Sequence, residues 1–228
     1  SIDPHLLEKI INTALSLGDF DEFTVEVGRE DTINSNLLKM LDGKVDRICI
    51  NPQSMNDSTA KLIGRKQSTK GILNAYEEAR KYDFIINMDT IVGLPGEDEE
   101  DILQTFSKIV DLSPDNLTVH TLAMKKGSSL TKNSYENKED IEKLLEVSHK
   151  IIKNNKYRPY YLYRQKDILG NFENTGYFKE EKVCAYNIVS MEESQSIIAA
   201  GMGAVSKILV DGNPIRIANF KSVSDYLD

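Results

Sequence analysis

Apolar side chains near the start of the chain recur at helical spacing. Asp3 can cap a helix at its amino end, Pro4 suits the first helical position, and Gly18 marks a stop. The pattern therefore predicts an amphipathic helix. Its apolar face consists of Leu6, Leu7, Ile10, Ile11, Ala14 and Leu15.

Beyond this helix, segments rich in β-forming residues alternate with segments of helical periodicity. An acidic run at residues 97–101 is interpreted as the solvated start of a helix, where carboxylates suit the positive end of the helix dipole. Strands are predicted at residues 22–27, 45–50, 84–92, 117–122 and 159–163. Amphipathic helices are predicted around residues 37–41, 68–82, 102–110 and 141–152.

The last part of the chain follows a different pattern. Ser190 and Glu193 have the spacing of a capping box, which predicts that a helix follows them. Apolar segments at residues 208–210 and 215–218 flank a turn sequence at residues 211–214. These segments predict a β-hairpin.

Strands that are each followed by an amphipathic helix indicate a parallel α/β architecture. We expect an incomplete (β/α) TIM-like barrel with a C-terminal β-hairpin extension, because too few strand-helix units are visible for a closed barrel. A flat, doubly wound sheet is the competing architecture, but it would normally carry a glycine-rich phosphate loop. The Gly-Leu-Pro-Gly run at residues 93–96 has neither the P-loop lysine nor the dinucleotide-binding spacing.

The composition is 40% hydrophobic and 28% charged, which is typical of a folded globular protein. The net charge of −8, with scattered basic residues, argues against a nucleic-acid-binding surface. No apolar run approaches the roughly 18 residues of a membrane-spanning helix, and no signal pattern opens the chain, so we expect a cytoplasmic protein. Cys49 and Cys184 are too few for a disulfide framework and too far apart for a short metal-binding motif, so we expect two core thiols.

Polar residues occur at the ends of the predicted strands, where a (β/α) barrel carries its chemistry. Glu26 ends the first of these strands, Gln53 follows the second, Asp89 interrupts the otherwise apolar third and His120 lies in the fourth. Arg65 lies between two of the strands. Each alone could cap a helix or pair with a surface charge. Together they suit an amino-acid nucleoside, because a carboxylate can hold an ammonium group or a ribose diol and a guanidinium can hold a carboxylate.

Three segments occur in a fixed order: Arg47-Ile-Cys-Ile-Asn-Pro-Gln53, Leu62-Ile-Gly-Arg65 and Ile86-Asn-Met-Asp89-Thr-Ile-Val-Gly-Leu-Pro95-Gly. This order and spacing resembles the radical S-adenosylmethionine (SAM) family of oxygen-independent coproporphyrinogen III oxidases. Later segments are similar to the coproporphyrinogen dehydrogenase subgroup of Gram-positive bacteria. They are Tyr161-Leu-Tyr-Arg-Gln-Lys, Gly170-Asn-Phe-Glu-Asn-Thr-Gly-Tyr177, Tyr186-Asn187 and Gly201-Met-Gly-Ala-Val-Ser206.

The resemblance implies a partial radical SAM barrel in residues 1–165 and a family-specific extension in residues 166–228. It also implies a SAM site in which polar side chains hold the amino, carboxylate and ribose groups and smaller residues contact the adenine. The implied assignments are Glu26 for the amino group, Arg65 for the carboxylate, Gln53 and Asp89 for the ribose hydroxyls, and Ala123 and Val205 for the adenine.

In that family, a CxxxCxxC loop holds a four-iron four-sulfur cluster, and SAM bound there yields a radical that removes hydrogen from a propionate. Oxidative decarboxylation of two propionates converts coproporphyrinogen III to protoporphyrinogen IX, with the porphyrinogen as substrate and an electron donor as partner. The cysteine loop, expected before Ser1, is absent from this sequence, so we assign no metal ligand and no catalytic residue. We therefore expect a fragment of a longer enzyme that is inactive alone.

Two alternatives stay open at this stage. One is a haem-binding chaperone of the same family, with His5, His120, His149 or a methionine as candidate axial ligand. The other is an unrelated barrel that binds another nucleoside.

Overall fold

The computed structural model describes residues 2–124 and 140–227. The chain forms two compact units, Ser1–Val183 and Cys184–Asp228. The boundary predicted between residues 165 and 166 separates the family's barrel from its extension, and it does not refer to compact units. It stays a prediction. Within the described part of the chain, no helix is long and apolar enough to cross a membrane.

The first unit is built on a six-stranded sheet in the order β1-β2-β3-β4-β6-β5. Strands β1 to β4 pair in parallel, and β6 pairs antiparallel with both of its neighbours, so β5 runs in the same direction as β4. The prediction of an incomplete barrel of parallel strands is confirmed. The strands are β1 (Thr24–Gly28), β2 (Arg47–Gln53), β3 (Ile85–Val92), β4 (Asn116–Thr121), β5 (Arg158–Tyr163) and β6 (Asn174–Phe178).

Strand β6 separates β5 from β4, and the sequence pattern does not predict it. Asn174 and Gly176 are of residue types that are depleted in strands. A Cβ atom built on Gly176 would lie 1.8 Å from the ring of Tyr161 in β5. Glycine is therefore required here by the close approach of a neighbouring aromatic ring.

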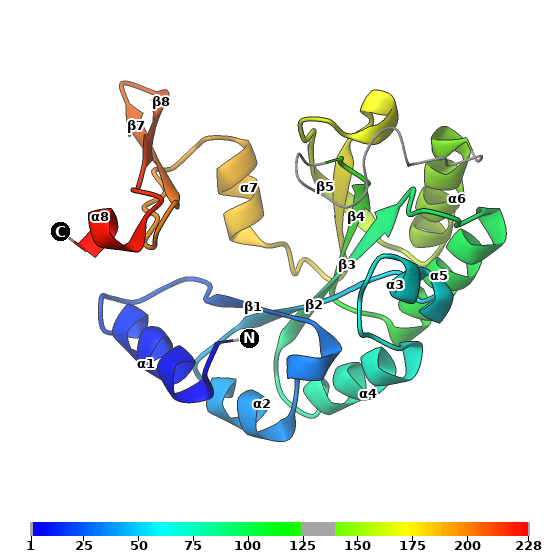
Figure 1. The fold of residues 1–228 in the computed structure, drawn as a ribbon, viewed down its shortest axis with the longest axis horizontal. Helices are drawn as coiled ribbons and strands as arrows, with labels where there is room; N and C mark the ends of the chain where they lie inside the picture. The colour runs from blue at the N-terminus through cyan, green and yellow to red at the C-terminus, as the bar shows by residue number, and fades with distance from the viewer. Residues whose placement is uncertain (1, 125–139, 228) are drawn as a thin grey trace. The chain divides into compact units, whose positions relative to one another are not determined.

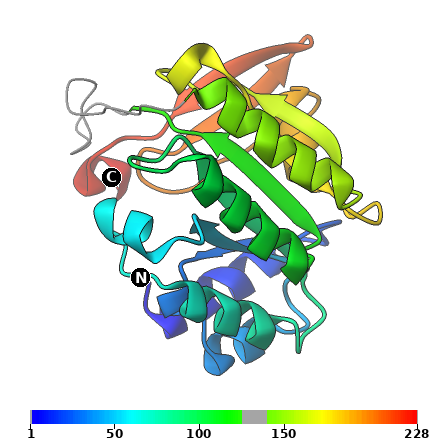
Figure 2. The same ribbon diagram turned by 90° about the vertical axis from the view of Figure 1, so that its right-hand side faces the viewer.

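Helices cover one face of the sheet, as Figure 1 shows from one side and Figure 2 from another, where α5 and α6 lie next to each other in front of the strands. The long helices are α1 (Pro4–Leu15), α2 (Ser35–Leu41), α4 (Thr69–Ala79), α5 (Glu99–Leu112) and α6 (Ile141–Asn154). Shorter helical segments are η1 (Glu30–Thr32), α3 (Asp57–Leu62) and η2 (Leu169–Asn171).

The core lies between the sheet and these helices. Ile48, Ile50, Ile86 and Met88 of the central strands are almost fully buried there. Because side chains alternate along a strand, the residues between them face the other side of the sheet. We call that side the polar face, and define it by Glu26, Cys49, Asn51, Asn87, Asp89, Thr118, His120, Tyr161 and Tyr163.

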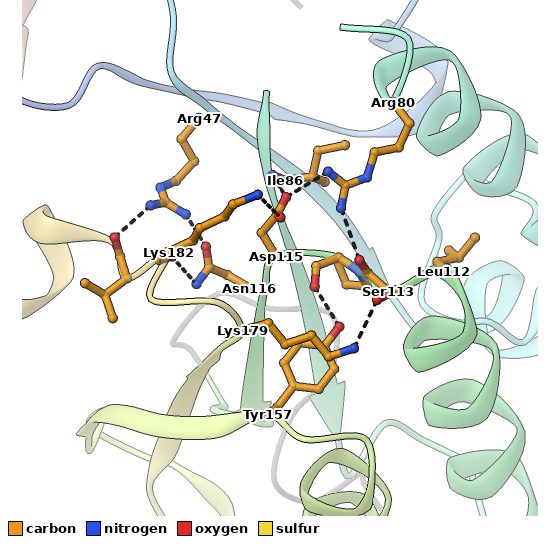
Figure 3. A network of polar contacts seen from close by, with 12 residues as sticks. Arg47, Arg80, Ile86, Leu112, Ser113, Asp115, Asn116, Tyr157, Lys179 and Lys182 are labelled. Atoms are coloured by element: carbon orange, nitrogen blue, oxygen red, sulfur yellow. Dashed lines mark hydrogen bonds and ion pairs between the residues drawn. The ribbon is translucent and has the colours of Figure 1, made fainter. Parts of the chain in front are cut away.

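A buried carboxylate fastens the amino ends of the central strands (Figure 3). Asp115 accepts hydrogen bonds from the Ile86 backbone N–H at 2.8 Å, from Arg80 at 2.9 Å and from Lys182 at 2.9 Å. Burial opposes ionisation of this carboxyl, but the hydrogen bonds from Ile86 and Lys182 and the charge of Arg80 outweigh it and lower the pKa of Asp115. The carboxylate thus connects β3, β4, α4 and the end of the first unit.

A second charged group lies beside it. The Arg47 side chain is 1% exposed, forms an ion pair with Glu22 at 2.9 Å and donates to the Asn116 side chain. It also donates to the backbone carbonyl of Val183 at 2.9 Å. The last residues of the first unit are therefore fixed against the amino ends of β2 and β4.

The second unit contains α7 (Ala185–Met191), β7 (Val205–Val210), β8 (Asn213–Ala218) and α8 (Val223–Leu227). Strands β7 and β8 pair antiparallel around Asp211 and Gly212, which have φ values of 50° and 76°. Two left-handed residues match the turn that tight hairpins favour. The predicted hairpin is confirmed.

The predicted capping box in this unit is wrong. Ser190 lies inside α7, and Glu193 lies just after that helix with a φ of 49°. The Glu193 carboxylate forms ion pairs with Lys207 at 3.1 Å and Arg216 at 3.2 Å. It is thereby directed to the hairpin instead of to a helix start.

Candidate functional site

Two carboxylates flank a thiol in the middle of strands β1, β2 and β3. Glu26 of β1 pairs in register with Cys49 of β2, and Cys49 pairs with Asn87 of β3. Burial raises the pKa of the Cys49 thiol, and the nearby charges of Glu26 and Asp89 raise it further. Cys49 is therefore a neutral thiol that lies between two acids, as expected for a buried cysteine rather than a metal ligand.

Asn51 connects Glu26 with Arg65. The Asn51 Nδ2 donates to Glu26 Oε2 at 3.4 Å, and Arg65 Nη1 donates to the Asn51 backbone carbonyl at 2.9 Å. The same Arg65 nitrogen donates to Gln67 Oε1 at 3.1 Å. Among the described residues, Nε and Nη2 of Arg65 have no hydrogen-bond acceptor, so they can serve an anionic group.

Arg65 is half-buried, which matters for its charge. Burial and the neighbouring Arg29 lower the pKa of Arg65, although Glu30 partly opposes the effect. The guanidinium stays charged, because its ordinary pKa lies far above neutrality. Among residues 2–124 and 140–227, no carboxylate forms an ion pair with Arg65. A partly desolvated cation of this kind favours an anionic ligand.

Gln53 ends β2 in an uncommon backbone conformation. Its φ is 61°, and the pairing of β2 with β3 becomes irregular between Ile50 and Gln53. Within the described part of the chain, the Gln53 side-chain amide makes no hydrogen bond. A non-glycine residue in the left-handed region is often found at functional sites, so the geometry singles out this amide.

Asp89 belongs to a polar network on β3, β4 and β5. Asn87 Nδ2 donates to Asp89 Oδ1 at 2.7 Å, and His120 Nε2 lies 3.9 Å from Asp89 Oδ2. The other ring nitrogen of His120 is 3.3 Å from the Tyr163 hydroxyl. One oxygen of Asp89 is thus fixed by an amide, and the other faces an imidazole.

Ala123 lies just beyond β4 and forms an isolated bridge with Ile168. The hydrogen bonds of that bridge are made by the neighbours of Ala123, Leu122 and Met124, so the Ala123 backbone groups take no part in them. Val205 opens β7 in the second unit and is 48% exposed. The contacts of Ala123 and Val205 with adenine stay predictions.

The structure therefore links Glu26, Arg65 and Asp89 through Asn51 and Cys49, with Gln53 two residues beyond Asn51. Cys49 was expected in the core because it lies inside the predicted strand at residues 45–50, and Asn51, which directly follows that strand, was not assigned to the site. Period-two alternation within β2 is the signal that could have found them.

This set of side chains fits the ammonium, carboxylate and ribose groups of SAM, because it offers a carboxylate, a guanidinium and a second carboxylate within one connected region. The thiols do not fit an iron-sulfur cluster. Cys49 and Cys184 are both buried and lie in different units, and no group of three candidate ligands occurs among residues 2–124 and 140–227.

Comparison with known families agrees with this chemistry. Residues 4–109 match the model of the radical SAM superfamily. The chain thus carries a radical SAM domain, and the class implied by the resemblance is confirmed. More narrowly, it is similar over most of its length to an oxygen-independent coproporphyrinogen-III oxidase-like protein.

Two curated relatives illustrate this position. The chain is 40% identical over 226 residues to the oxygen-independent coproporphyrinogen-III oxidase-like protein HemZ of Bacillus subtilis, covering 96% of this chain and 45% of that protein. It is 22% identical over 221 residues to the heme chaperone HemW of Buchnera aphidicola, covering 96% of this chain and 55% of that protein. The chain spans about half the length of these relatives.

A solved structure shows the same fold. Coproporphyrinogen III oxidase HemN from Escherichia coli matches with a TM-score of 0.74 at 17% identity, over 98% of this chain and 52% of that chain. The predicted radical SAM barrel is thereby confirmed at the level of the fold.

Proposed function

We propose that this chain is the SAM-holding part of a radical SAM oxidoreductase that converts coproporphyrinogen III to protoporphyrinogen IX in the cytoplasm. The observation that carries the proposal is the link from Glu26 through Asn51 to Arg65, which connects an acid and a guanidinium by hydrogen bonds to the same residue. The relation to HemZ supports the choice of substrate. An electron donor is the further partner that this reaction requires.

In this proposal, the residues of the chain bind and orient the nucleoside. Glu26 accepts hydrogen bonds from the ammonium group, and Arg65 pairs with the carboxylate. Gln53 and Asp89 hold the ribose hydroxyls. Bound to a four-iron four-sulfur cluster, SAM supplies the radical that removes hydrogen from a propionate. Holding both ends of the nucleoside restricts where its reactive carbon can lie.

Calorimetric titration of the chain with S-adenosylhomocysteine tests the binding site. The substitution Asp89→Asn should weaken the binding of S-adenosylhomocysteine about tenfold or more, because it removes a charge-assisted hydrogen bond to the ribose. Asp83→Asn is the matched control, because Asp83 is an exposed carboxylate just before β3, at the other end of the strand. Equal affinities of the Asp89→Asn and Asp83→Asn variants would contradict the proposal.

The reaction is tested in the protein that carries this chain together with its cluster. Anaerobic incubation with coproporphyrinogen III, SAM, a reductant for the cluster and a one-electron acceptor for the substrate radical should yield protoporphyrinogen IX with the wild-type residues. The Asp89→Asn variant should yield much less. A protein with an intact cluster and bound SAM that releases no carbon dioxide from this substrate would refute the oxidase activity.

A haem chaperone is the second candidate, favoured by the similarity to HemW and by His120 on the polar face. Addition of haem should then shift its Soret absorption band, and His120→Ala should abolish the shift. The oxidase proposal predicts no His120-dependent shift.

A further inference from the structure

Glu97 is a buried acid that the proposed chemistry does not use. It directly follows the Gly-Leu-Pro-Gly run at residues 93–96, beyond the end of β3, and is 2% exposed. Asp98 and Asp101 form a capping box at the start of α5, in agreement with the interpretation of the acidic run at residues 97–101 as a helix start. For Glu97 the expectation of a solvated side chain is wrong.

The Glu97 carboxyl contacts the segment that follows β2. Ser54 Oγ donates to Glu97 Oε1 at 2.5 Å, and it lies 3.5 Å from the hydroxyl of Thr105 in α5. That Thr105 hydroxyl also accepts a hydrogen bond from the Met55 backbone N–H at 3.2 Å. The loop after β3 and helix α5 thus hold the loop after β2 through buried polar contacts.

These contacts act next to Gln53. Ser54 adjoins the left-handed Gln53, and Ser54 Oγ accepts from the Asn56 backbone N–H at 3.1 Å. From the other side, the Gln67 side chain donates to the carbonyls of Pro52 and Ser54. A left-handed non-glycine residue persists only where its surroundings hold it, and here Gln67 and Glu97 do so from two sides.

The second carboxyl oxygen of Glu97 is less well satisfied. Glu97 Oε2 is buried and has no hydrogen-bond partner among the described residues. Burial raises the pKa of Glu97 to about 7, against the effect of the Ser54 and Thr59 hydroxyls, and Asp101 and Asp98 raise it further. The protonated acid suits this position, whereas the ionised acid places an unpaired charge in the interior.

We propose that Glu97 is a positioning residue for the nucleoside site, and that it acts through Ser54 on the backbone of Gln53. The inference rests on the proposed function, because Gln53 is assigned there to the ribose. Ionisation of Glu97 disfavours its buried position and so loosens the support of Gln53. Affinity for the nucleoside therefore falls as the carboxyl ionises.

Titration with S-adenosylhomocysteine from mildly acidic to mildly alkaline pH tests this inference. Wild-type affinity should fall as the pH rises through about 7. Glu97→Gln keeps the shape and the acceptor for Ser54 but cannot ionise, so it should bind tightly without this fall. Glu97→Ala and Ser54→Ala each remove the hydrogen bond and should bind up to about tenfold more weakly at every pH.

Asp115→Asn controls for a general loss of stability. Asp115 lies at the amino end of β4, away from Gln53, so this substitution should leave the affinity unchanged. This inference is overturned if Glu97→Gln shows the wild-type pH profile and Ser54→Ala binds like the wild type. The proposed function still stands in that case, provided that Asp89→Asn weakens binding. If the wild-type chain does not bind the probe, both fall together. Thermal unfolding of each variant shows whether lost binding reflects lost folding.

Discussion

At the scale of single residues, two buried carboxyl groups differ in their surroundings. Asp115 accepts hydrogen bonds from two cations and a backbone N–H, whereas Glu97 accepts from a neutral hydroxyl and has two acids nearby. The pKa of Asp115 is therefore lowered and that of Glu97 is raised. Burial is common to both, so the partners decide the direction of each shift.

Glu97→Gln should change how stability depends on pH. A carboxyl whose folded-state pKa is raised binds its proton more tightly in the folded state. The free energy of unfolding therefore falls as the pH rises from the ordinary pKa to the raised pKa. The window runs from the ordinary value of 4.5 to about 7. Across it, the wild type should lose about 3 kcal/mol relative to Glu97→Gln. Urea unfolding of both proteins measures this difference, and parallel pH profiles would contradict the assignment.

At the scale of elements, β6 shows how a strand can depend on one small residue. It is hydrogen-bonded to β4 and β5, and Gly176 accommodates the Tyr161 ring that lies across it. Tyr161 in turn lies 3.4 Å from the Thr118 hydroxyl of β4. The aromatic ring thus spans β6 on the polar face.

Gly176→Ala should lower the free energy of unfolding by about 1–3 kcal/mol, the usual cost of an overpacked site. The cause is the clash of the new methyl group with Tyr161. In a Tyr161→Ala background the same substitution should cost much less, which a double-mutant cycle of urea unfolding measures. Additive effects of the two substitutions would show that the ring is not what excludes the methyl group.

Sequence patterns predicted the elements that have strong periodicity. The strands β1 to β5 and the helices α1, α2, α4, α5 and α6 were recognisable, and the turn sequence at residues 211–214 predicted the hairpin, whereas the short helix α3 was missed. Strand β6 was missed because its pairing depends on contacts distant in sequence. The capping box failed because the Glu193 carboxylate pairs with hairpin cations instead. In the candidate site, the polar strand ends were recognisable, and period-two alternation within β2 could have found Asn51. The role of Glu97 depends on tertiary neighbours that the sequence does not reveal.

At the scale of the whole molecule, polar groups at the amino ends of the strands stabilise the first unit, while those at the carboxyl ends remain partly unpaired. Asp115 is 7% exposed and connects α4, β3 and β4 with Lys182 near the end of the unit. The proposed nucleoside site and the ion pairs of Asp115 thus lie at different places along one sheet. Changes to these ion pairs can alter stability without altering binding.

Asp115→Asn should lower the free energy of unfolding by about 2 kcal/mol or more at neutral pH, because it weakens hydrogen bonds to charged groups. Since the folded-state pKa of Asp115 is lowered, this contribution is present above the ordinary value of 3.8 and is lost as pH falls below it. The difference between wild type and variant should therefore shrink in acid. Guanidinium unfolding at neutral and acid pH measures it, and a constant gap would argue against an ionised Asp115.

The alternation within β2 has a further consequence. A slip of one residue along its neighbours would carry Arg47 and Cys49 under the helices and turn Ile48 and Ile50 outward. Burying a guanidinium in the apolar core without an ionic partner is strongly unfavourable, so the shifted register of β2 is unstable. The buried apolar residues of β2 thereby fix the positions of the polar residues that we propose as ligand contacts.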